Sequence, residues 1–88
     1  MKSLLFFLFL FSNSLHPVFS QSNLLENVKK NPGEAINICK KFREFNSRGI
    51  SASSDIAIEY VSKKNKLTPV DAEIFSIYVI GLHCPDII

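Results

Sequence analysis

Two segments of the chain, residues 31–34 and 68–71, carry the same helix-start signature. Each has a capping side chain, a proline directly after it and an acid three residues after the cap: Asn31 with Glu34, and Thr68 with Asp71. The cap and the acid satisfy N–H groups that a helix leaves free at its start, and the fixed φ of proline suits the first turn. The two signatures predict helices that begin near residues 32 and 69.

The segment after the first signature has a single apolar stripe. Its members recur at the spacing i, i+3, i+4, i+7 and i+10: Ala35, Ile38, Cys39, Phe42 and Phe45. This spacing is typical of one buried face of an α-helix. Charged residues fill the opposite side, and Gly49 is well placed to end the helix. We therefore expect Cys39 to point inward.

The segment after the second signature is apolar on most of its sides between residues 70 and 82. A helix with apolar residues nearly all round is typically a central one, covered by its neighbours. Pro85 ends it just after Cys84, because proline cannot continue a helix. The run 77–80 is rich in β-branched residues and is the one place where a strand could compete. The cap upstream and the length of the segment favour a helix.

Two shorter segments complete the predicted fold. The first, residues 24–30, places Leu24, Leu25 and Val28 on one helix face. The second follows the serine-rich loop 51–55 and ends at the basic run 63–66, whose positive charge suits the negative end of a helix dipole. We expect an all-α fold, a compact bundle of three to four short helices.

The first twenty residues are typical of a secretory signal peptide. Lys2 precedes an unbroken apolar run, residues 4–11, and a polar stretch follows it. The run falls well short of the roughly 20 residues that span a bilayer, so an uncleaved anchor is the weaker alternative. We predict that residues 1–20 are removed after Ser20, that residues 21–31 form an N-terminal segment with a short helix, and that residues 32–88 form the helical domain. The protein would then be exported, to the periplasm or the extracellular space.

The chain has two cysteines, Cys39 and Cys84. Small exported domains commonly add disulfides, because a core of this size supplies little stability. Closing a loop of about 45 residues would add about 4 kcal/mol in the chain-entropy treatment. We predict one intramolecular bridge, with reduced thiols, an intermolecular bridge or half of a metal site as alternatives. Metal is the weakest of these, because His83 and two distant cysteines lack the short ligand spacing of zinc sites.

The sequence carries few signs of catalytic chemistry. It has no glycine-rich phosphate loop, no pair of histidines at helical spacing and no Cys-x-x-Cys motif. His83 suits a helix-end cation better than a general base. The acids Asp55, Glu59, Asp71 and Glu73 suit helix caps and solvated faces. We predict no catalytic, cofactor-binding or metal-binding residue, and hence no enzyme and no cofactor.

Residues 24–86 resemble a known family. The residues that carry the resemblance are Ala35-x-x-x-Cys39, Leu67-Thr68-x-x-Asp71-Ala72-x-Ile74-Phe75-x-x-Tyr78 and Cys84-Pro85-Asp86. This arrangement resembles the exported bacterial family called domain of unknown function 732. The resemblance implies a signal peptide, a small helical body, one cysteine in an early helix and a second in a Cys-Pro near the C-terminus. It implies no activity.

These observations favour a small exported helical protein that binds or supports an unknown protein or envelope partner without catalysis. Ten Lys and Arg against eight Asp and Glu give no electrostatic reason to expect nucleic acid, and we expect membrane contact only through the signal peptide. One alternative is a membrane-active, toxin-like or inhibitor-like polypeptide. Another is a thiol redox sensor built on Cys39 and Cys84, which would need an exposed, reactive thiol.

Overall fold

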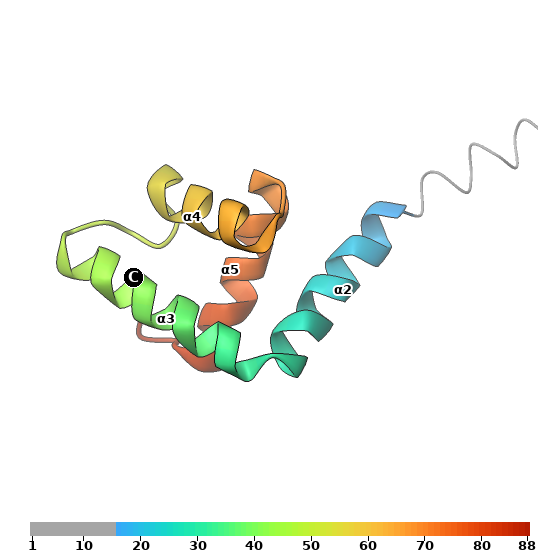
Figure 1. The fold of residues 1–88 in the computed structure, drawn as a ribbon, viewed down its shortest axis with the longest axis horizontal. Helices are drawn as coiled ribbons and strands as arrows, with labels where there is room; N and C mark the ends of the chain where they lie inside the picture. The colour runs from blue at the N-terminus through green and yellow to red at the C-terminus, as the bar shows by residue number, and fades with distance from the viewer. Residues whose placement is uncertain (1–15) are drawn as a thin grey trace, which may run out of the picture.

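The computed structural model describes the backbone of residues 16–88 and the side chains from residue 23 onward. Its helices are α2 (His16–Lys30), α3 (Pro32–Ser47), α4 (Asp55–Asn65) and α5 (Pro69–His83), shown in Figure 1. This part of the chain contains four helices and no strand, which confirms the all-α prediction. The run 77–80 is helical and lies within α5.

The predicted starts of α3 and α5 are confirmed. Of the two predicted caps, only the one at Thr68 is confirmed. The hydroxyl of Thr68 accepts a hydrogen bond from the backbone N–H of Asp71 (3.2 Å). Asn31 does not cap α3, because its side-chain amide donates instead to the carbonyl and the side-chain oxygen of Asn27 (3.0 Å each). A single residue separates α2 from α3. The Asn31 side chain therefore closes the end of α2 and leaves the start of α3 without a cap.

Helix α2 is longer than the predicted segment 24–30. It begins at His16 and continues without a break to Lys30. Neither glycine nor proline occurs between residues 18 and 30, so nothing in the sequence interrupts the helix. The predicted cleavage position after Ser20 falls within this helix. Most of the predicted signal peptide lies outside the described residues.

The core consists of the α3 stripe and the faces that pack against it. All five predicted stripe residues are buried, Cys39 among them. Ala72, Phe75 and Val79 are buried on α5, and α2 contributes Leu24 and Val28. The periodicity of the sequence therefore identifies the buried face of α3.

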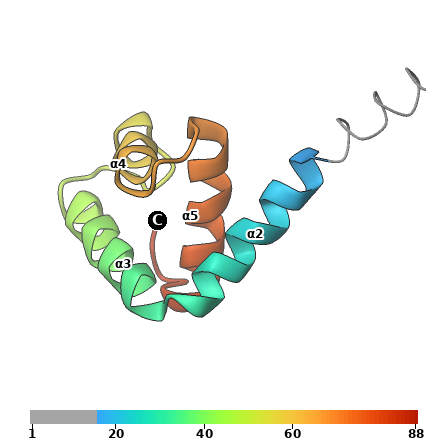
Figure 2. The same cartoon turned by 45° about the vertical axis from the view of Figure 1, so that its right-hand side comes forward.

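Helix α5 is central, as predicted, because it packs against α2, α3 and α4. Figure 2 shows it between α2 and the other two helices. It is not covered all round, since Val70 remains 67% exposed and Ile77 62% exposed. Three neighbouring helices bury one side of α5 and leave an apolar strip open. None of the described helices is both long and apolar enough to cross a membrane.

Candidate functional site

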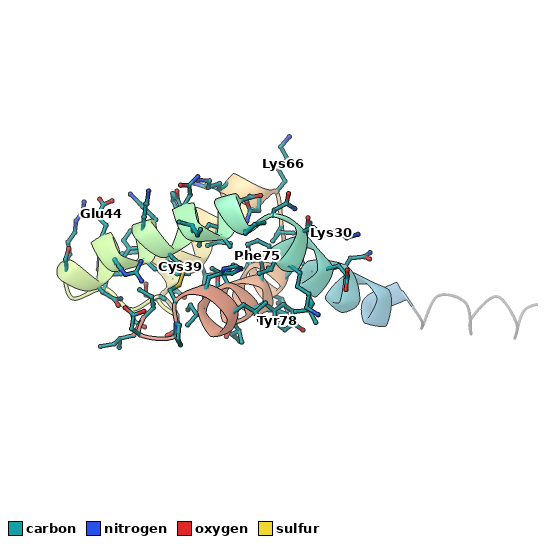
Figure 3. The ribbon with its side chains drawn as sticks, turned by 90° about the horizontal axis from the view of Figure 1, so that it is seen from below. Lys30, Cys39, Glu44, Lys66, Phe75 and Tyr78 are labelled. Carbon is teal, nitrogen blue, oxygen red and sulfur yellow. A yellow bond between two sulfur atoms is a disulfide. The ribbon has the colours of Figure 1, made fainter. Side chains whose placement is uncertain are left out.

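Cys39 and Cys84 form a disulfide that joins the middle of α3 to the residue that ends α5. The Cα atoms lie 6.1 Å apart, and the two residues are 2% and 1% exposed. The predicted intramolecular bridge is confirmed, and free thiols are excluded for these two cysteines. Figure 3 shows Cys39 inside the bundle, where α3 passes over α5.

The C-terminal residues are tied down beside this bridge. The side-chain amide of Asn46 donates to the carbonyls of Ile50 (2.9 Å) and Ile88 (3.0 Å), and its oxygen accepts from the N–H of Ile88 (3.0 Å). The N–H of Ala52 also donates to the carbonyl of Ile88 (2.9 Å). Arg43 and Asp86 form an exposed ion pair (3.3 Å). We call this region, residues 39, 43, 46, 84 and 86–88, the staple end.

The acids and the histidine singled out from the sequence do not form one cluster. Asp55 and Asp71 lie in the first turns of α4 and α5, and His83 lies in the last turn of α5. Glu59 pairs with Lys63 (2.8 Å), whose hydrogen bond and charge lower the pKa of this carboxyl. The residues described contain no group of three or more His, Cys, Asp or Glu side chains that could hold a metal ion.

A hollow of about 280 Å³ lies where the end of α2 and the start of α3 face the end of α4. We call it the corner hollow. Its lining is Leu24, Asn27, Val28, Asn31, Glu34, Ala35, Lys64, Asn65, Lys66, Leu67 and Phe75. Leu24, Val28 and Phe75 lie at its floor, but these core residues are buried and expose little apolar surface to it. In Figure 3, Phe75 lies within the bundle and Lys66 extends from its edge.

The rim of the corner hollow carries charges of both signs. Glu34 comes from the first turn of α3, and Lys64 and Lys66 come from the end of α4. Lys64 donates to the hydroxyl of Tyr60 (3.3 Å) and lies over its ring. The ion pairs found between described residues involve neither Glu34 nor Lys66.

Asn65 also lines the hollow, with both polar atoms of its side-chain amide buried. Neither atom has a hydrogen-bond partner among the residues that the structure describes. A buried polar group without a partner costs about 1–3 kcal/mol. Such groups are rare in folded proteins, and each needs an explanation.

Lys66 follows Asn65 in the left-handed conformation, with φ 55°. This conformation costs a residue with a side chain about 1–2 kcal/mol, and glycine is the usual choice. Ser62 holds the turn, since its carbonyl accepts from the N–H of Leu67 (3.0 Å) and its hydroxyl donates to the carbonyl of Leu67 (2.6 Å).

Sequence reasoning missed this site, because the basic run 63–66 fits a helix end without any further role. The available signal was a helix that ends on Asn-Lys where a glycine is expected.

These features define a small all-helical domain with one buried disulfide and a polar-rimmed hollow. A family model described as "Domain of unknown function (DUF8664)" matches residues 25–84, and the chain belongs to this family. The match includes α3, α4, both cysteines and the corner hollow apart from Leu24. The resemblance was thus right that this is a domain of unknown function, but the family that matches is not domain of unknown function 732. No curated protein and no solved structure matches the chain.

Proposed function

We propose that this protein is exported through the secretory pathway and acts there as a non-catalytic binding module. The observation that carries the proposal is the buried Cys39–Cys84 bridge. Disulfides persist in oxidising compartments and are rare in the cytosol, so a structural bridge in so short a chain favours export. The signal-peptide pattern of residues 1–20 supports the same location.

The binding role is supported by the difference between the staple end, which is held rigidly, and the corner hollow, which is not. The bridge and the bonded C-terminus fix the staple end, while the corner hollow keeps rim charges and an unpartnered amide. Polar groups that line one hollow without partners of their own are typical of ligand sites.

Burial of the bridge also bears on the redox-sensor alternative. Thiol–disulfide exchange requires that a thiolate reach one of the two sulfur atoms. Cys39 and Cys84 are 2% and 1% exposed, so the folded protein shields both. A structural bridge explains this burial better than a reversible redox pair does.

The intact mass of the protein from the exported fraction tests the proposal, measured without and with reductant. We expect the mass of residues 21–88 less two hydrogen atoms, and we expect reduction only after denaturation. A full-length mass, free thiols or reduction of the folded protein by mild reductant would overturn the proposal.

A pair of variants tests the cleavage position. Ser20→Phe places a large side chain directly before the cut and should block or move cleavage, since signal peptides need small residues there. The control Gln21→Asn, on the other side of the cut, should leave the cleavage position unchanged.

A further inference from the structure

We propose that the open apolar strip of α5 pairs two copies of this chain. In the pair, α5 of one copy packs antiparallel against α5 of the other, about a two-fold axis. The inference goes beyond the proposed function, because it concerns a different surface: no residue of the strip lines the corner hollow. It also holds whether or not the protein is exported.

The open side of α5 repeats with the spacing of a coiled-coil seam. Val70, Ile74, Ile77 and Gly81 follow one another at intervals of four, three and four residues. Residues at this spacing form a line along a helix through which two helices can pack. Val70, Ile77 and Gly81 are exposed, and Ile74 is partly buried. We call these four residues the α5 strip.

The side of α5 that the bundle buries is a different one. It consists of Ala72, Phe75, Ser76 and Val79, none of which belongs to the strip. Figure 3 shows α5 along the lower edge of the bundle, with α3 above it. The helix therefore has one apolar face for its own bundle and a second, open one.

Gly81 is the member of the strip that the single chain does not explain. A Cβ atom at this position would meet no other atom within 4 Å, so no contact in the described part of the chain requires a glycine. Glycine is also among the least favourable residues within a helix, because it loses the most backbone freedom on folding. It is useful where another group approaches the backbone closely. A partner that packs against the strip accounts for Gly81.

The α5 strip is complementary to itself when one copy is reversed. In an antiparallel pair the first residue of one strip meets the last residue of the other. Val70 then lies over Gly81 of the other copy, and Ile74 lies beside Ile77. The large side chain fills the space that glycine leaves, at both ends of the pair, as a two-fold interface requires. A parallel pair would set Gly81 opposite Gly81 and leave a gap.

The charges beside the strip favour the same direction. Asp71 and Glu73 lie near the start of α5, and His83 lies in its last turn. An antiparallel pair brings the acidic start of each helix to the end that carries His83 in the other copy, and it opposes the two helix dipoles. A parallel pair would gather four carboxylates at one end.

Charge also separates a second copy from a membrane as the occupant of the strip. Residues 67–88 contain no lysine and no arginine, whereas acids flank the strip. Anionic lipid surfaces attract basic segments and repel acidic ones. A second copy therefore fits the α5 strip better than an anionic membrane does.

The size of the contact sets the strength of the pair. A helix of 15 residues is about 22 Å long and about 10 Å wide with its side chains. Two such faces bury less than the roughly 1,200 Å² from which stable interfaces begin, and smaller contacts are typical of weak, transient complexes. We expect a dissociation constant between about 10 μM and about 1 mM.

Sedimentation velocity and NMR test the inference on the oxidised protein, with no other molecule added. From about 10 μM to about 1 mM, the weight-average mass should rise from one copy toward two. Amide shifts that change with concentration should centre on Ile74 and Ile77. In a mixture of isotope-labelled and unlabelled copies, the methyl groups of Val70 should show a nuclear Overhauser effect to Gly81 of the other copy.

Two strip variants and one control separate this pair from general stickiness. Gly81→Leu adds apolar surface but fills the space for Val70, so it should raise the dissociation constant about tenfold or more. Ile77→Glu should leave only single copies at about 1 mM. The control Ile36→Glu makes the same change at an exposed position of α3 and should associate like the wild type. All three positions are exposed, so the circular dichroism spectra should match the wild type.

Five results would overturn the inference: single copies only at about 1 mM, equal or stronger association of Gly81→Leu, association that survives Ile77→Glu, association that Ile36→Glu also removes, or a Val70–Val70 effect between copies in place of Val70–Gly81. Vesicles of phosphatidylcholine and phosphatidylglycerol provide the remaining comparison. Strip shifts that appear with these vesicles and not with protein concentration would assign the strip to a membrane, against the inference.

Discussion

Two asparagines near the ends of neighbouring helices have opposite surroundings. Asn46, in the last turn of α3, bonds through both ends of its amide to the backbone of Ile50 and Ile88. Asn65, the last residue of α4, has both amide atoms buried and bonds to none of the described residues. The same side chain thus stabilises the staple end and destabilises the corner hollow.

The difference between the two ends extends to the backbone. Helix α3 is followed by Gly49 at φ 77°, a conformation that glycine adopts readily, whereas α4 is followed by Lys66 at φ 55°. The staple end also holds the bridge. We infer that stability is concentrated at the staple end and that the corner hollow gives up stability for binding, as functional sites commonly do.

The largest expected effect comes from removal of the bridge. The double variant Cys39→Ala/Cys84→Ala should lose about 4 kcal/mol of unfolding free energy in urea, since the closed loop spans a separation of 45 residues. Wild-type protein unfolded and refolded in excess reductant, with both thiols unmodified, is the control and should show a similar loss. A loss below about 1 kcal/mol would mean that the staple end does not dominate stability.

Removal of the Asn46 amide should have the next largest effect. Asn46→Ala removes the hydrogen-bond partner of the Ile50 carbonyl and of the Ile88 N–H, and we expect a loss of about 1–2 kcal/mol in urea unfolding. The matched control is Asn37→Ala, which removes an exposed amide from the same helix and should change stability little. Equal effects of the two variants would contradict the role of Asn46.

Asn65→Leu should act in the opposite direction. It replaces an unpartnered buried amide by an apolar group of similar size, so we expect a gain of about 1–2 kcal/mol. A loss of stability would show that the amide has a partner in the folded protein.

Lys66 and Gly49 both adopt the left-handed backbone conformation, and exchanging their residue types should change stability in opposite directions. Lys66→Gly should gain about 1 kcal/mol in thermal unfolding, because glycine adopts this conformation without strain. Gly49→Ala should lose a similar amount, and since no atom crowds the added methyl group, the loss would come from the backbone alone. If both variants raised or both lowered the stability, backbone strain would not distinguish the corner hollow from the staple end.

The smallest expected effect concerns Glu59 and Lys63, which lie in neither end. The neighbouring Lys63 lowers the pKa of Glu59, so the pair stabilises the fold above the ordinary glutamate pKa and loses this effect as the pH falls through the lowered value. Lys63→Gln should return the Glu59 pKa to its ordinary range in a carboxyl NMR titration. The melting temperature at neutral pH should hardly change, because both side chains are exposed.

Local sequence patterns predicted α3 and α5, and the presence of only two cysteines predicted the bridge. The starts of α3 and α5, the inward position of Cys39 and the end of α5 before Pro85 all depend on residues a few positions apart. The cap by Asn31 failed for a local reason too, since two helices compete for one side chain. Export and signal-peptide cleavage remain predictions.

The hydrogen bonds of the staple end and the corner hollow could not be predicted in the same way. Asn46 and Ile88 lie 42 positions apart, and no periodicity links them. The corner hollow joins α2, α3, α4 and α5, so its charges meet only after the bundle has formed. Whether the Asn65 amide finds a partner depends on the side chains that pack around it, and a single sequence does not show these.

The bridge gives the molecule a covalent topology of a ring with two tails. Residues 39–84 form the ring, which contains all of α4 and α5, whereas α2 lies in the N-terminal tail. A single proteolytic cut within the ring, for example in the loop 51–54, would leave one covalently connected molecule. A cut at the Asn31–Pro32 junction would release α2 and with it Leu24 and Val28, part of the floor of the corner hollow. One cut outside the ring would therefore remove part of the corner hollow while the ring itself stays closed.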